Sequence, residues 1–566
     1  MSLIGALNLG KQALAIQQAA IQTTGNNIAN AGNADYTRQT TSTTPNRDQQ
    51  LRAGLFVGTG LNLTAIQRQI DESLQTRLRA AVSEDQSGDV TQQWLSRVEA
   101  VFNELSNQDL SSHFSEFFNS WSELANKPQD IGLRQVVLQN GKDVAQYLQG
   151  LREQLGGLQG DAESRLSALT ADANNLAQQI ADVNGQIVLT EGGAGPANGL
   201  RDQRDALLRR LSELVDIKTV PQDSGVVNVY VGSEPLIIGT DNRGVSVKQE
   251  SDGQTIHSTV TFKSNNGSMS LSAGQLGALD SVHDTIDGVV ESIDELAGAM
   301  IFELNKLHSS GQGLEGLASV TSSNSVDDAT VALNDPGSGL EFVPANGSFV
   351  VHVRSKATGL VTSTLIRVDL DGLNSNDTTL TSLAADLDAA PNVSASINAG
   401  KLAIAADSAN VEISFSQDSS GALAALGINT FFTGSSARDI AVNQSLLDKP
   451  QLLAAARNGE NGDNQTALAI AALERAALAS LDGTSLMDGY QSVVNGVASS
   501  AASARSNAEG AKLVRETLEN QREALSGVSL DEEAVNLMQQ QRAFQGAARL
   551  IASINEMMQE LVNLVR

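Results

Sequence analysis

The sequence contains no cysteine and few aromatic residues. Of its 566 residues only 3% are Phe, Trp or Tyr. The missing cysteines exclude disulfide bonds, thiolate catalysis and cysteine-ligated metal sites. Because large rings are scarce, hydrophobic cores must be built mainly from Leu, Val, Ile and Ala, a composition that suits long helices and small β-domains.

Positive charge is also scarce, since 37 Lys and Arg stand against 65 Asp and Glu and give a formal net charge of −28. Nucleic acids and anionic membrane surfaces are bound through clusters of Lys and Arg, so we expect neither as a partner. No run of about 18 apolar residues occurs, which excludes a membrane-spanning helix. The first 20 residues are amphipathic and show no charged segment followed by an apolar core. A cleaved secretory signal is therefore not expected.

What the sequence does contain is a long amphipathic pattern from Leu530 to Val565. Apolar residues recur there every three or four positions in two adjacent stripes. A two-stranded seam buries only one stripe, so this helix needs more than one partner helix. Ser529 is placed to cap it, and three acidic residues stand at the positive end of its dipole. These are Asp531, Glu532 and Glu533; the first stripe is Leu530, Ala534, Leu537, Gln541, Phe544, Ala548, Ile551, Asn555, Met558, Val562 and Val565, and the second is Ala547, Leu550, Ile554, Met557, Leu561 and Leu564.

A similar stripe opens the chain and makes its first helix a candidate partner for the last. An amphipathic helix gains little by folding alone, so we expect roughly the first 60 and last 40 residues to be mobile in the monomer and to fold on assembly. Gln541 and Asn555 interrupt the carboxyl-terminal stripe; they either fix register and partner number or are simply exposed to solvent. The predicted assembly interface is Leu3, Leu7, Leu14, Ile21, Ile28, Leu537, Phe544, Ile551, Ile554, Met558, Leu561, Val562 and Val565.

Between the ends, helical and strand-like patterns alternate. Leu61 to Val82 looks helical, and Leu133 to Ile187 predicts a helix on the order of 80 Å long, with a stutter near Leu158. Val226 to Ser272 predicts four to six short strands, by the usual strand length of roughly five or six residues. The predicted fold class is α+β and multidomain, a discontinuous helical rod or coiled coil from the N- and C-terminal parts with inserted mainly-β domains. The predicted domains are 1–60 with 526–566 (terminal coiled-coil axial domain), 61–216 with 273–312 and 457–525 (helical rod), 217–272 (small β subdomain) and 313–456 (β-rich outer domain).

No motif justifies a catalytic site. Gly311 to Gly316 matches the GxGxxG pattern but follows a helix instead of a strand, so we interpret it as a hinge. The five histidines show no pair at metal-ligand spacing and are interpreted as surface residues. The acidic loop Asp369 to Asp377 fails the EF-hand spacing, which favours a solvated turn. We therefore predict no enzyme activity, no metal and no cofactor. The histidines are His113, His257, His283, His308 and His352.

Three segments resemble bacterial flagellar axial proteins. Leu426 to Gly434, followed by Asp439 to Asn443, is similar to a segment of the hook-associated protein 1 branch of that family. Ser526 to Glu533, which runs into Gln541 to Gln545, resembles the carboxyl-terminal signature of axial proteins generally. The amino-terminal motif is Asn26, Asn27, Ile28, Ala29 and Asn30, followed by Tyr36, Thr37, Arg38 and Gln39; Asn8-Leu9-Gly10 and Asn33-Ala34-Asp35 depart from the Ser-Gly-Leu and Pro-Gly that relatives often carry.

This resemblance implies a structural subunit that is exported by the flagellar type III system, forms a ring at the distal end of the hook, joins hook to filament and is required for filament assembly. It implies as partners other copies of the chain, the hook protein, the next hook-associated protein toward the filament, and a cytoplasmic export chaperone on the carboxyl-terminal helix. The protein would then be secreted into the extracellular flagellum after a transient stay in the cytoplasm. An alternative is a surface-exposed adhesin or binding protein that uses the axial scaffold.

Overall fold

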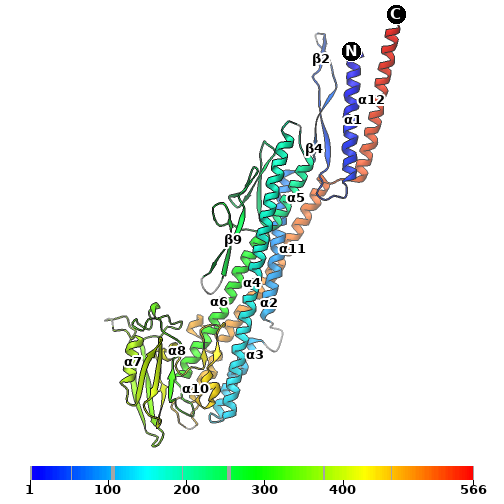
Figure 1. Cartoon of the computed structure of the whole chain (residues 1–566). Helices are drawn as coiled ribbons and strands as arrows, with labels where there is room; N and C mark the ends of the chain where they lie inside the picture. The colour runs from blue at the N-terminus through cyan, green and yellow to red at the C-terminus, as the bar shows by residue number, and fades with distance from the viewer. Residues whose placement is uncertain are drawn as a thin grey trace. The chain divides into compact units, whose positions relative to one another are not determined.

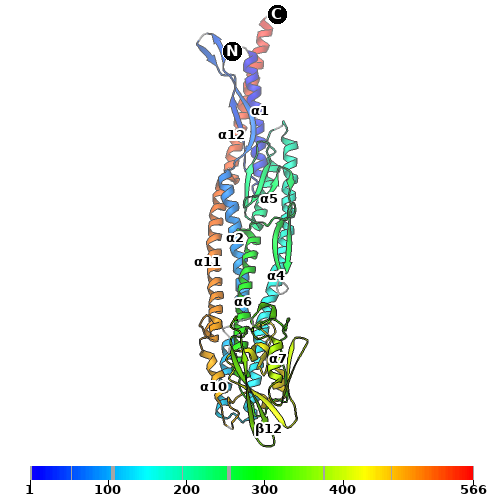
Figure 2. The ribbon, with the colours of Figure 1, turned by 90° about the vertical axis from the view of Figure 1, so that its left-hand side faces the viewer.

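The computed structural model describes residues 3–52, 54–102, 109–193, 195–251, 256–373, 376–460 and 462–564. The chain divides into two compact units. The first contains Met1–Trp94, Ala162–His283 and Ser503–Arg566, and the second contains Leu95–Asp161 and Asp284–Ala502. Long helices contribute residues to both units (Figure 2), namely α2 Glu72–Phe102, α4 Ile131–Glu191, α6 Gly274–Ser309 and α11 Leu486–Ser526.

In the first unit the two ends of the chain form an antiparallel helix pair (Figure 1). α1 Leu3–Ala29 packs along α12 Leu530–Leu564. The two helices approach closely at Gly10, where an added Cβ would come within 2.8 Å of Ile551 Cγ1. A larger residue at position 10 would therefore push the helices apart.

The start of α12 agrees with the sequence pattern. The amide of Glu532 donates to Ser529 Oγ at 3.4 Å, and three acidic residues occupy the first helical turn. The predicted carboxyl-terminal helix is confirmed over its described residues.

The segment after α1 forms strands that the sequence pattern did not reveal. Its Thr-rich run is extended and pairs antiparallel with Leu61–Arg68, so the prediction of a helix over Leu61 to Val82 is wrong for its first part. Thr favours the extended backbone, and the paired strands satisfy each other's backbone groups. The apolar residues of one short strand can match the helical period by chance. The sequence alone does not show that such a strand pairs with another strand. The elements are β1 Gln39–Pro45, β2 Gln49–Arg52, β3 Leu55–Val57 and β4 Leu61–Arg68, with α2 beginning at Glu72.

The remainder of the first unit contains α5 Asn198–Leu214, a four-stranded sheet and a hairpin. The sheet has the order β5-β6-β7-β8, and β9 pairs with β10. Val227, Val229 and Val231 of β6 are buried at alternate positions, as a half-buried strand requires. Strands predicted in Val226 to Ser272 are confirmed. The strands are β5 Ile217–Pro221, β6 Val227–Val231, β7 Glu234–Ile238, β8 Asp241–Asn242, β9 Val245–Ser251 and β10 Ile256–Phe262.

The long helix α4 is also confirmed and has 61 residues. Most of the apolar stripe predicted along it is buried, whereas Leu158 and Leu176 are only half-buried. Leu158 is the residue at which the predicted stutter shifts the stripe around the helix. None of the helices in the described ranges is long and apolar enough to cross a membrane.

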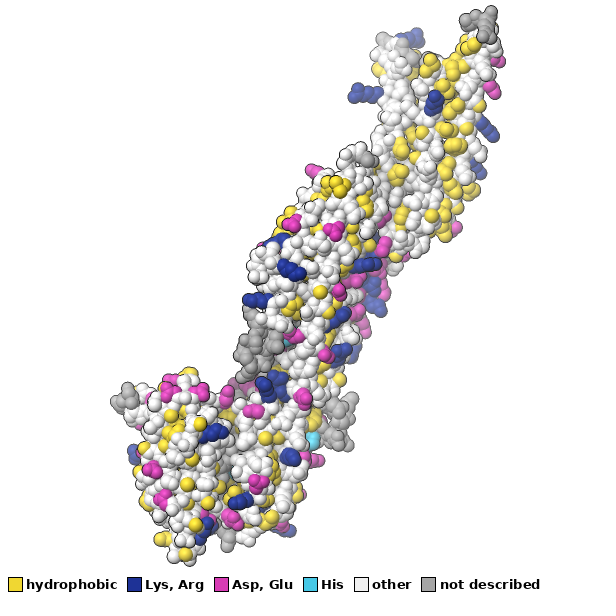
Figure 3. All heavy atoms as spheres, viewed as in Figure 1, with side chains coloured by type: hydrophobic (Ala, Val, Ile, Leu, Met, Phe, Trp, Pro, Cys, Tyr) yellow, Lys and Arg dark blue, Asp and Glu magenta, His cyan; other side chains and the backbone are white. Residues whose placement is uncertain are grey.

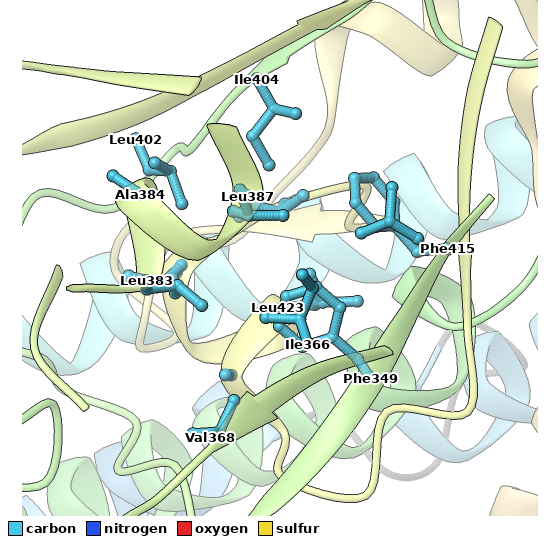
Figure 4. Close-up of a cluster of buried hydrophobic side chains, with 14 of the residues drawn as sticks. Phe349, Ile366, Val368, Leu383, Ala384, Leu387, Leu402, Ile404, Phe415 and Leu423 are labelled. Atoms are coloured by element: carbon cyan, nitrogen blue, oxygen red, sulfur yellow. The ribbon is translucent and has the colours of Figure 1, made fainter. Parts of the chain in front are cut away.

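In the second unit, two antiparallel sheets and a short helix enclose a common core (Figure 4). The sheets have the orders β11-β15-β14 and β13-β12-β16. Phe349 of β12 and Phe415 of β16 point toward Leu383 and Leu387 of the helix α7 Leu380–Asp388. Strands of this insertion are β11 Ser319–Thr321, β12 Gly347–Ser355, β13 Val361–Val368, β14 Val393–Asn398, β15 Lys401–Ala406 and β16 Val411–Ser416.

The segment from Leu426 to Gly434 joins this insertion to the helices of the second unit. Phe431 lies 5.6 Å from Trp121, measured between ring centroids, and 4.7 Å from Phe432. Asn305 of α6 donates to the Phe432 carbonyl at 2.9 Å. Trp121 belongs to α3 Leu110–Asn126; the remaining short elements are α8 Ala422–Leu426, β17 Phe432–Thr433, β18 Ala441–Val442, α9 Gln444–Asp448, α10 Gln465–Ala472 and the 3-10 turns Pro336–Ser338, Pro450–Leu452, Leu473–Arg475 and Ala479–Leu481.

The GxGxxG segment packs tightly against residues 451–456. The Gln312 amide donates to the Ala456 carbonyl at 2.8 Å, and the Ala456 amide returns a bond at 3.1 Å. A Cβ on Gly313 would overlap the Gln451 carbonyl oxygen. The glycine therefore permits a close backbone approach at this place.

The interpretation of all five histidines as surface residues is wrong for His283 and His308, which are buried; the side chain of His257 lies outside the described residues. The Ala454 amide donates to His308 Nε2 at 3.0 Å, and His308 Nδ1 lies 2.8 Å from the Asn429 carbonyl oxygen. These contacts fit a neutral ring with its proton on Nδ1. Burial lowers the pKa of His308 to about 4.

We expect His308 to stay neutral in the folded protein down to about pH 4. Its pKa is lowered from 6.5 to about 4, so the unfolded chain binds the extra proton first as the pH falls. The wild type should lose about 3 kcal/mol of unfolding free energy through this group between those pH values, and His308→Gln should lack this loss. The pKa of His308 is measured by NMR titration of the histidine ring carbon signals. The His308 signal is the one that is missing from the spectrum of His308→Gln. A His308 signal that titrates near pH 6.5 would contradict the expectation.

Candidate functional site

The side chain of Asn27 joins the two ends of the chain. It is buried near the end of α1, and its Nδ2 donates to Glu533 Oε2 of α12 and to the Gln39 carbonyl, both at 2.9 Å. Its Oδ1 accepts from Tyr36 OH at 2.7 Å and from the Gln39 amide at 3.0 Å. All four hydrogen-bonding positions of the amide are thus filled. Aspartate at position 27 would lose both donors and place a second carboxylate against Glu533.

Arg38 supplies the charge that a buried Glu533 requires. Its Nε and Nη2 donate to Glu533 Oε1 at 2.9 and 2.7 Å, and its Nη1 pairs with Glu532 Oε2 at 2.9 Å. The Glu533 side chain is 2% exposed, whereas that of Glu532 is 62% exposed. A carboxylate at such depth is tolerated only when it is paired and hydrogen-bonded. We call Asn27, Tyr36, Arg38, Gln39 and Glu533 the terminal clasp.

Backbone hydrogen bonds hold the loop that carries Arg38. The Arg38 amide donates to the carbonyl of Ser526, the last residue of α11, at 3.0 Å, and the Gln69 amide donates to the Arg38 carbonyl at 2.8 Å. Backbone hydrogen bonds alone therefore fix the loop between α1 and β1 to the junction of α11 and α12, and the side chains of the loop add further contacts.

Acidic residues of α5 border the clasp. Asp202 and Asp205 accept hydrogen bonds from Arg68 Nη1 at 2.9 and 2.7 Å. Burial raises the pKa of Asp202, and hydrogen bonds from Arg68 oppose this effect. Burial, followed by the nearby charges of Asp202 and Glu533, raises the pKa of Tyr36 to about 12. Tyr36 therefore keeps its proton and remains a donor to Asn27 over the physiological pH range.

The other motif residues have less central places. Asn30 Nδ2 donates to the Asn26 carbonyl at 2.9 Å and so satisfies an end carbonyl of α1. Asn26 Nδ2 lies 3.3 Å from Tyr36 OH. Ile28 is half-buried and Ala29 is exposed.

The structure brings most of the predicted interface residues together within one chain. The face of α12 toward α1 follows a regular four-three spacing and draws on both predicted stripes. This face is Glu533, Leu537, Gln540, Phe544, Ala547, Ile551, Ile554 and Met558; on α1, Leu3, Leu7, Leu14, Ile21 and Ile28 are half-buried. Leu561 and Val562 are exposed, and Val565 lies outside the described residues. Their role between molecules stays a prediction.

A second apolar face of α12 is left uncovered. Hydrophobic side chains follow this helix on the face shown in Figure 3. Successive spacings of seven, four and three residues place four of them on one side of the helix. We call these four the outer stripe; they are Leu550, Met557, Leu561 and Leu564, with exposed fractions from 41% to 81%.

The two amides proposed to fix register are exposed in this structure. Gln541 and Asn555 face solvent, and Gln540 is half-buried in their place. The Oε1 atom of Gln540 is buried and has no hydrogen-bond partner among the described residues. Selection of neighbours by Gln541 and Asn555 remains a hypothesis.

Sequence reasoning missed the partners that complete the clasp. The sequence pattern assigns Glu533 only to the helix dipole, yet this residue lies seven positions before Gln540 on the heptad that continues through Ala547 and Ile554. That heptad could have identified it as an inward-facing charge. Arg68 and Asp202 lie on elements far apart in the sequence, and no local pattern indicates that they meet.

The acidic loop of the second unit is engaged with its own backbone. Asp369, Asp371 and Asp377 lie close together. Asp371 accepts from the Leu373 amide at 2.8 Å, and Asp377 accepts from the Gly372 amide at 3.0 Å. Asn374 of the same loop lies outside the described residues.

Comparisons with known proteins agree with this arrangement. The family model described as the flagellar hook-associated protein FlgK helical domain matches residues 95–321, and that of the flagellar basal body rod FlgEFG protein C-terminal matches residues 521–564, which include α12. Flagellar hook-associated protein 1 of Escherichia coli is 25% identical over 99% of both chains. Its namesake in Bacillus subtilis is 25% identical over 98% of this chain and 97% of the relative.

A solved structure supports the fold. The structure of the flagellar hook junction protein FlgK from Burkholderia pseudomallei covers 80% of this chain and 100% of its own, with a TM-score of 0.50 and 16% identity. The helices at both ends and the β-insertions between them agree with that fold, and the named relatives support a structural role in the flagellum. In sequence, the chain is similar to flagellar hook-associated protein 1 over nearly its full length, as the resemblance predicted.

We predict that Glu533→Ala loosens the helix pair far more than Glu532→Ala. Removing the Glu533 carboxylate leaves Arg38 and Asn27 without their shared buried partner, which should lower the free energy of opening α1 and α12 by about 3 kcal/mol. The exposed Glu532 should contribute less than about 1 kcal/mol. Hydrogen exchange of the α1 and α12 amides measures both values in the full-length monomer. Equal losses would contradict the prediction, and so would unprotected amides in the wild type, which would show that the pair forms only on assembly.

Proposed function

We propose that the chain is a structural subunit of the bacterial flagellum that forms the junction between hook and filament and is required for filament assembly. The observation that carries the proposal is the outer stripe of α12, which remains exposed after α1 has covered the other apolar face. An exposed apolar helix face of this kind marks a surface that another molecule covers. Relatives named flagellar hook-associated protein 1 over nearly the full length of the chain support this role.

The proposed partners are other axial subunits. Copies of the same chain in a ring, the hook protein on one side and the next hook-associated protein on the other would bury the outer stripe. The similar protein from Burkholderia pseudomallei is named a hook junction protein, which supports this place. The clasp would hold α1 and α12 in register, so that the stripe is presented in one fixed orientation.

We further propose that the subunit is exported by the flagellar type III system, passing from the cytoplasm to the extracellular flagellum. A cytoplasmic chaperone on α12 would cover the outer stripe before export, since an exposed stripe favours aggregation. In this proposal residues 1–60 and 526–566 form the axial domain, in which the pair of α1 and α12 is formed but opens transiently in the monomer and becomes fully ordered on assembly. Residues 61–216, 273–312 and 457–525 form the helical part, and 217–272 and 313–456 form the β-domains.

We expect substitution of the outer stripe to block assembly without unfolding the chain. The triple variant Leu550→Gln, Met557→Gln and Leu561→Gln should leave thermal unfolding of the monomer nearly unchanged, since all three side chains are already exposed. It should fail to restore swimming and filaments in a strain that lacks the gene. The matched control is Leu360→Gln with Leu365→Gln, whose side chains are 71% and 56% exposed in the second unit, and it should restore both.

Electron microscopy of the deletion strain separates the junction role from other roles. Bare hooks, with flagellin shed into the medium, are the expected result. Normal filaments in that strain, or full rescue by the triple variant, would contradict the proposal.

A second candidate function is adhesion through the β-rich insertion. Exposed apolar residues gather there at the start and middle of the edge strand β13, namely Leu360, Val361 and Leu365. If the Leu360→Gln and Leu365→Gln variant forms normal filaments but its cells lose attachment to a surface, the insertion is a binding module as well. Unchanged attachment removes this candidate.

A further inference from the structure

The strand β13 forms an open edge of its sheet in the second unit. The sheet has the order β13-β12-β16, and within the described part of the chain β13 pairs with β12 alone. The opposite edge is different, because Leu317 and Ile413 of β16 exchange two backbone hydrogen bonds, each of 2.8 Å. One edge of the sheet is therefore partly covered, and the edge at β13 is available to a further strand.

The backbone groups at this open edge belong to alternate residues of β13. The Ser355 amide donates to the Leu360 carbonyl at 2.9 Å, which continues the register of β12 and β13 toward the turn. In an antiparallel pair every second residue bonds the neighbouring strand. The even-numbered residues of β13 thus bond β12, and the odd-numbered ones direct their amides and carbonyls outward. The outward-directed residues are Val361, Ser363, Leu365 and Arg367.

The side chains of β13 also favour pairing at this edge. Val361 and Leu365 are 48% and 56% exposed, whereas Ile366 and Val368 on the other face point into the core shown in Figure 4. Edge strands are ordinarily protected from pairing by proline, by a bulge or by lysine. β13 contains no proline or lysine, and its register with β12 has no shift. The strand therefore has the composition of one that is paired on both sides.

We propose that β13 pairs antiparallel with β13 of a second copy of the chain, about a two-fold axis at Ser363. In this register Val361 lies opposite Leu365 of the other copy, and the axis repeats this apolar pair. An axis between Ser363 and Leu365 would place Val361 opposite Arg367, and an axis at Leu365 would place it opposite Asp369. The register at Ser363 is thus the one that matches both exposed apolar residues.

The charges at the two ends of β13 are complementary in this arrangement. Lys356 is exposed in the turn before the strand, and Asp369, Asp371 and Asp377 lie close together directly after it. An antiparallel pair places the start of one strand beside the end of the other. Lys356 of each copy therefore comes near the acidic loop of the other, where Arg367 offsets only part of the negative charge. This complementarity favours a second copy over an unrelated strand.

The contact is distinct from the one that would form a ring. A two-fold axis joins copies in pairs, whereas a ring requires a repeated head-to-tail contact. The inference therefore does not rest on the proposed junction role. Because the paired strands are short, we expect a weak dimer, which is best detected by trapping it covalently.

The test is disulfide trapping in the full-length chain, which contains no natural cysteine. Opposed residues of a hydrogen-bonded antiparallel pair have Cα atoms about 5.5 Å apart, within the range of a disulfide. Ser363→Cys should therefore give linked dimers on mild oxidation. Arg367→Cys is the matched control on the same exposed face of β13. Its two copies would be roughly 26 Å apart along the strands, so it should form linked dimers at least about 10-fold more slowly.

A second substitution tests the apolar pair itself. Leu365→Lys added to Ser363→Cys should slow trapping about 10-fold, because both copies of the pair with Val361 are lost. Leu468→Lys is the control for added charge, since Leu468 lies on α10 and is 45% exposed. Added to Ser363→Cys, it should leave the rate of trapping unchanged.

Three outcomes would overturn the proposal. Equal trapping of Ser363→Cys and Arg367→Cys would show random collision or association through another surface, such as α12. Loss of surface attachment in the Leu360→Gln and Leu365→Gln variant, without trapping of Ser363→Cys, would assign β13 to a foreign surface. If Ser363→Cys does not fold, a mixture of Val361→Cys and Leu365→Cys chains decides, and the absence of links between the two variants would disprove the register.

Discussion

The first unit depends on one buried carboxylate, that of Glu533. Its burial is tolerable only because Arg38 and Asn27 reach it, and these residues are separated from it by about 500 positions in the chain. A buried ion pair of this kind need not add net stability, but removing one partner is costly. The terminal clasp therefore mainly fixes the position of α1 relative to α12. It fixes which residue of α1 stands opposite which residue of α12, and the apolar contacts from Gly10 to Ile551 follow from that register.

The sequence was sufficient for the features that repeat. The period of apolar residues identified the helices α12 and α4 and most of the buried face of α4, because a helix repeats its environment every three or four residues. On α12 the buried face draws on both predicted stripes and includes Glu533 and Gln540, which neither stripe contains. The sequence was insufficient where structure depends on a distant partner. β4 has a short pattern that also fits a helix, and only its pairing with the Thr-rich β1 makes it a strand. The sequence indicated only part of the terminal clasp. Asn27 and Arg38 belong to the family motif and were singled out. Glu533 was not, because it is a charged residue at a buried heptad position, and charged residues are ordinarily expected on the solvent-exposed face of a helix.

The second unit also contains a buried residue whose environment depends on partners distant in the sequence. Nothing around His308 in the sequence indicates burial, because the two backbone groups that bond its ring nitrogens belong to Asn429 and Ala454, more than a hundred residues later. The segment from Leu426 to Gly434 was recognisable as a family feature, and the structure supplies the physical reason. Its two phenylalanines fill an aromatic cluster with Trp121, while Asn305 satisfies the backbone between them. A polar side chain thus holds the turn, and rings provide the buried area.

The two kinds of contact at the chain ends suit different tasks. Apolar stripes of Leu and Met gain free energy with any apolar neighbour, so they supply affinity with little selectivity. A buried network of an amide, a guanidinium and a carboxylate tolerates only one arrangement, because each unsatisfied group costs about 1 to 3 kcal/mol. Within the chain, α12 contacts α1 through both kinds of contact. The terminal clasp sets the register, and the apolar residues on the face of α12 toward α1 supply the buried apolar area. The outer stripe has only the first kind along its described residues, so selectivity toward a neighbour must come from other groups. Gln541 and Asn555 are exposed too, but at 3.6 residues per turn they lie on the far side of α12 from the outer stripe, and their part in selecting a neighbour stays a hypothesis.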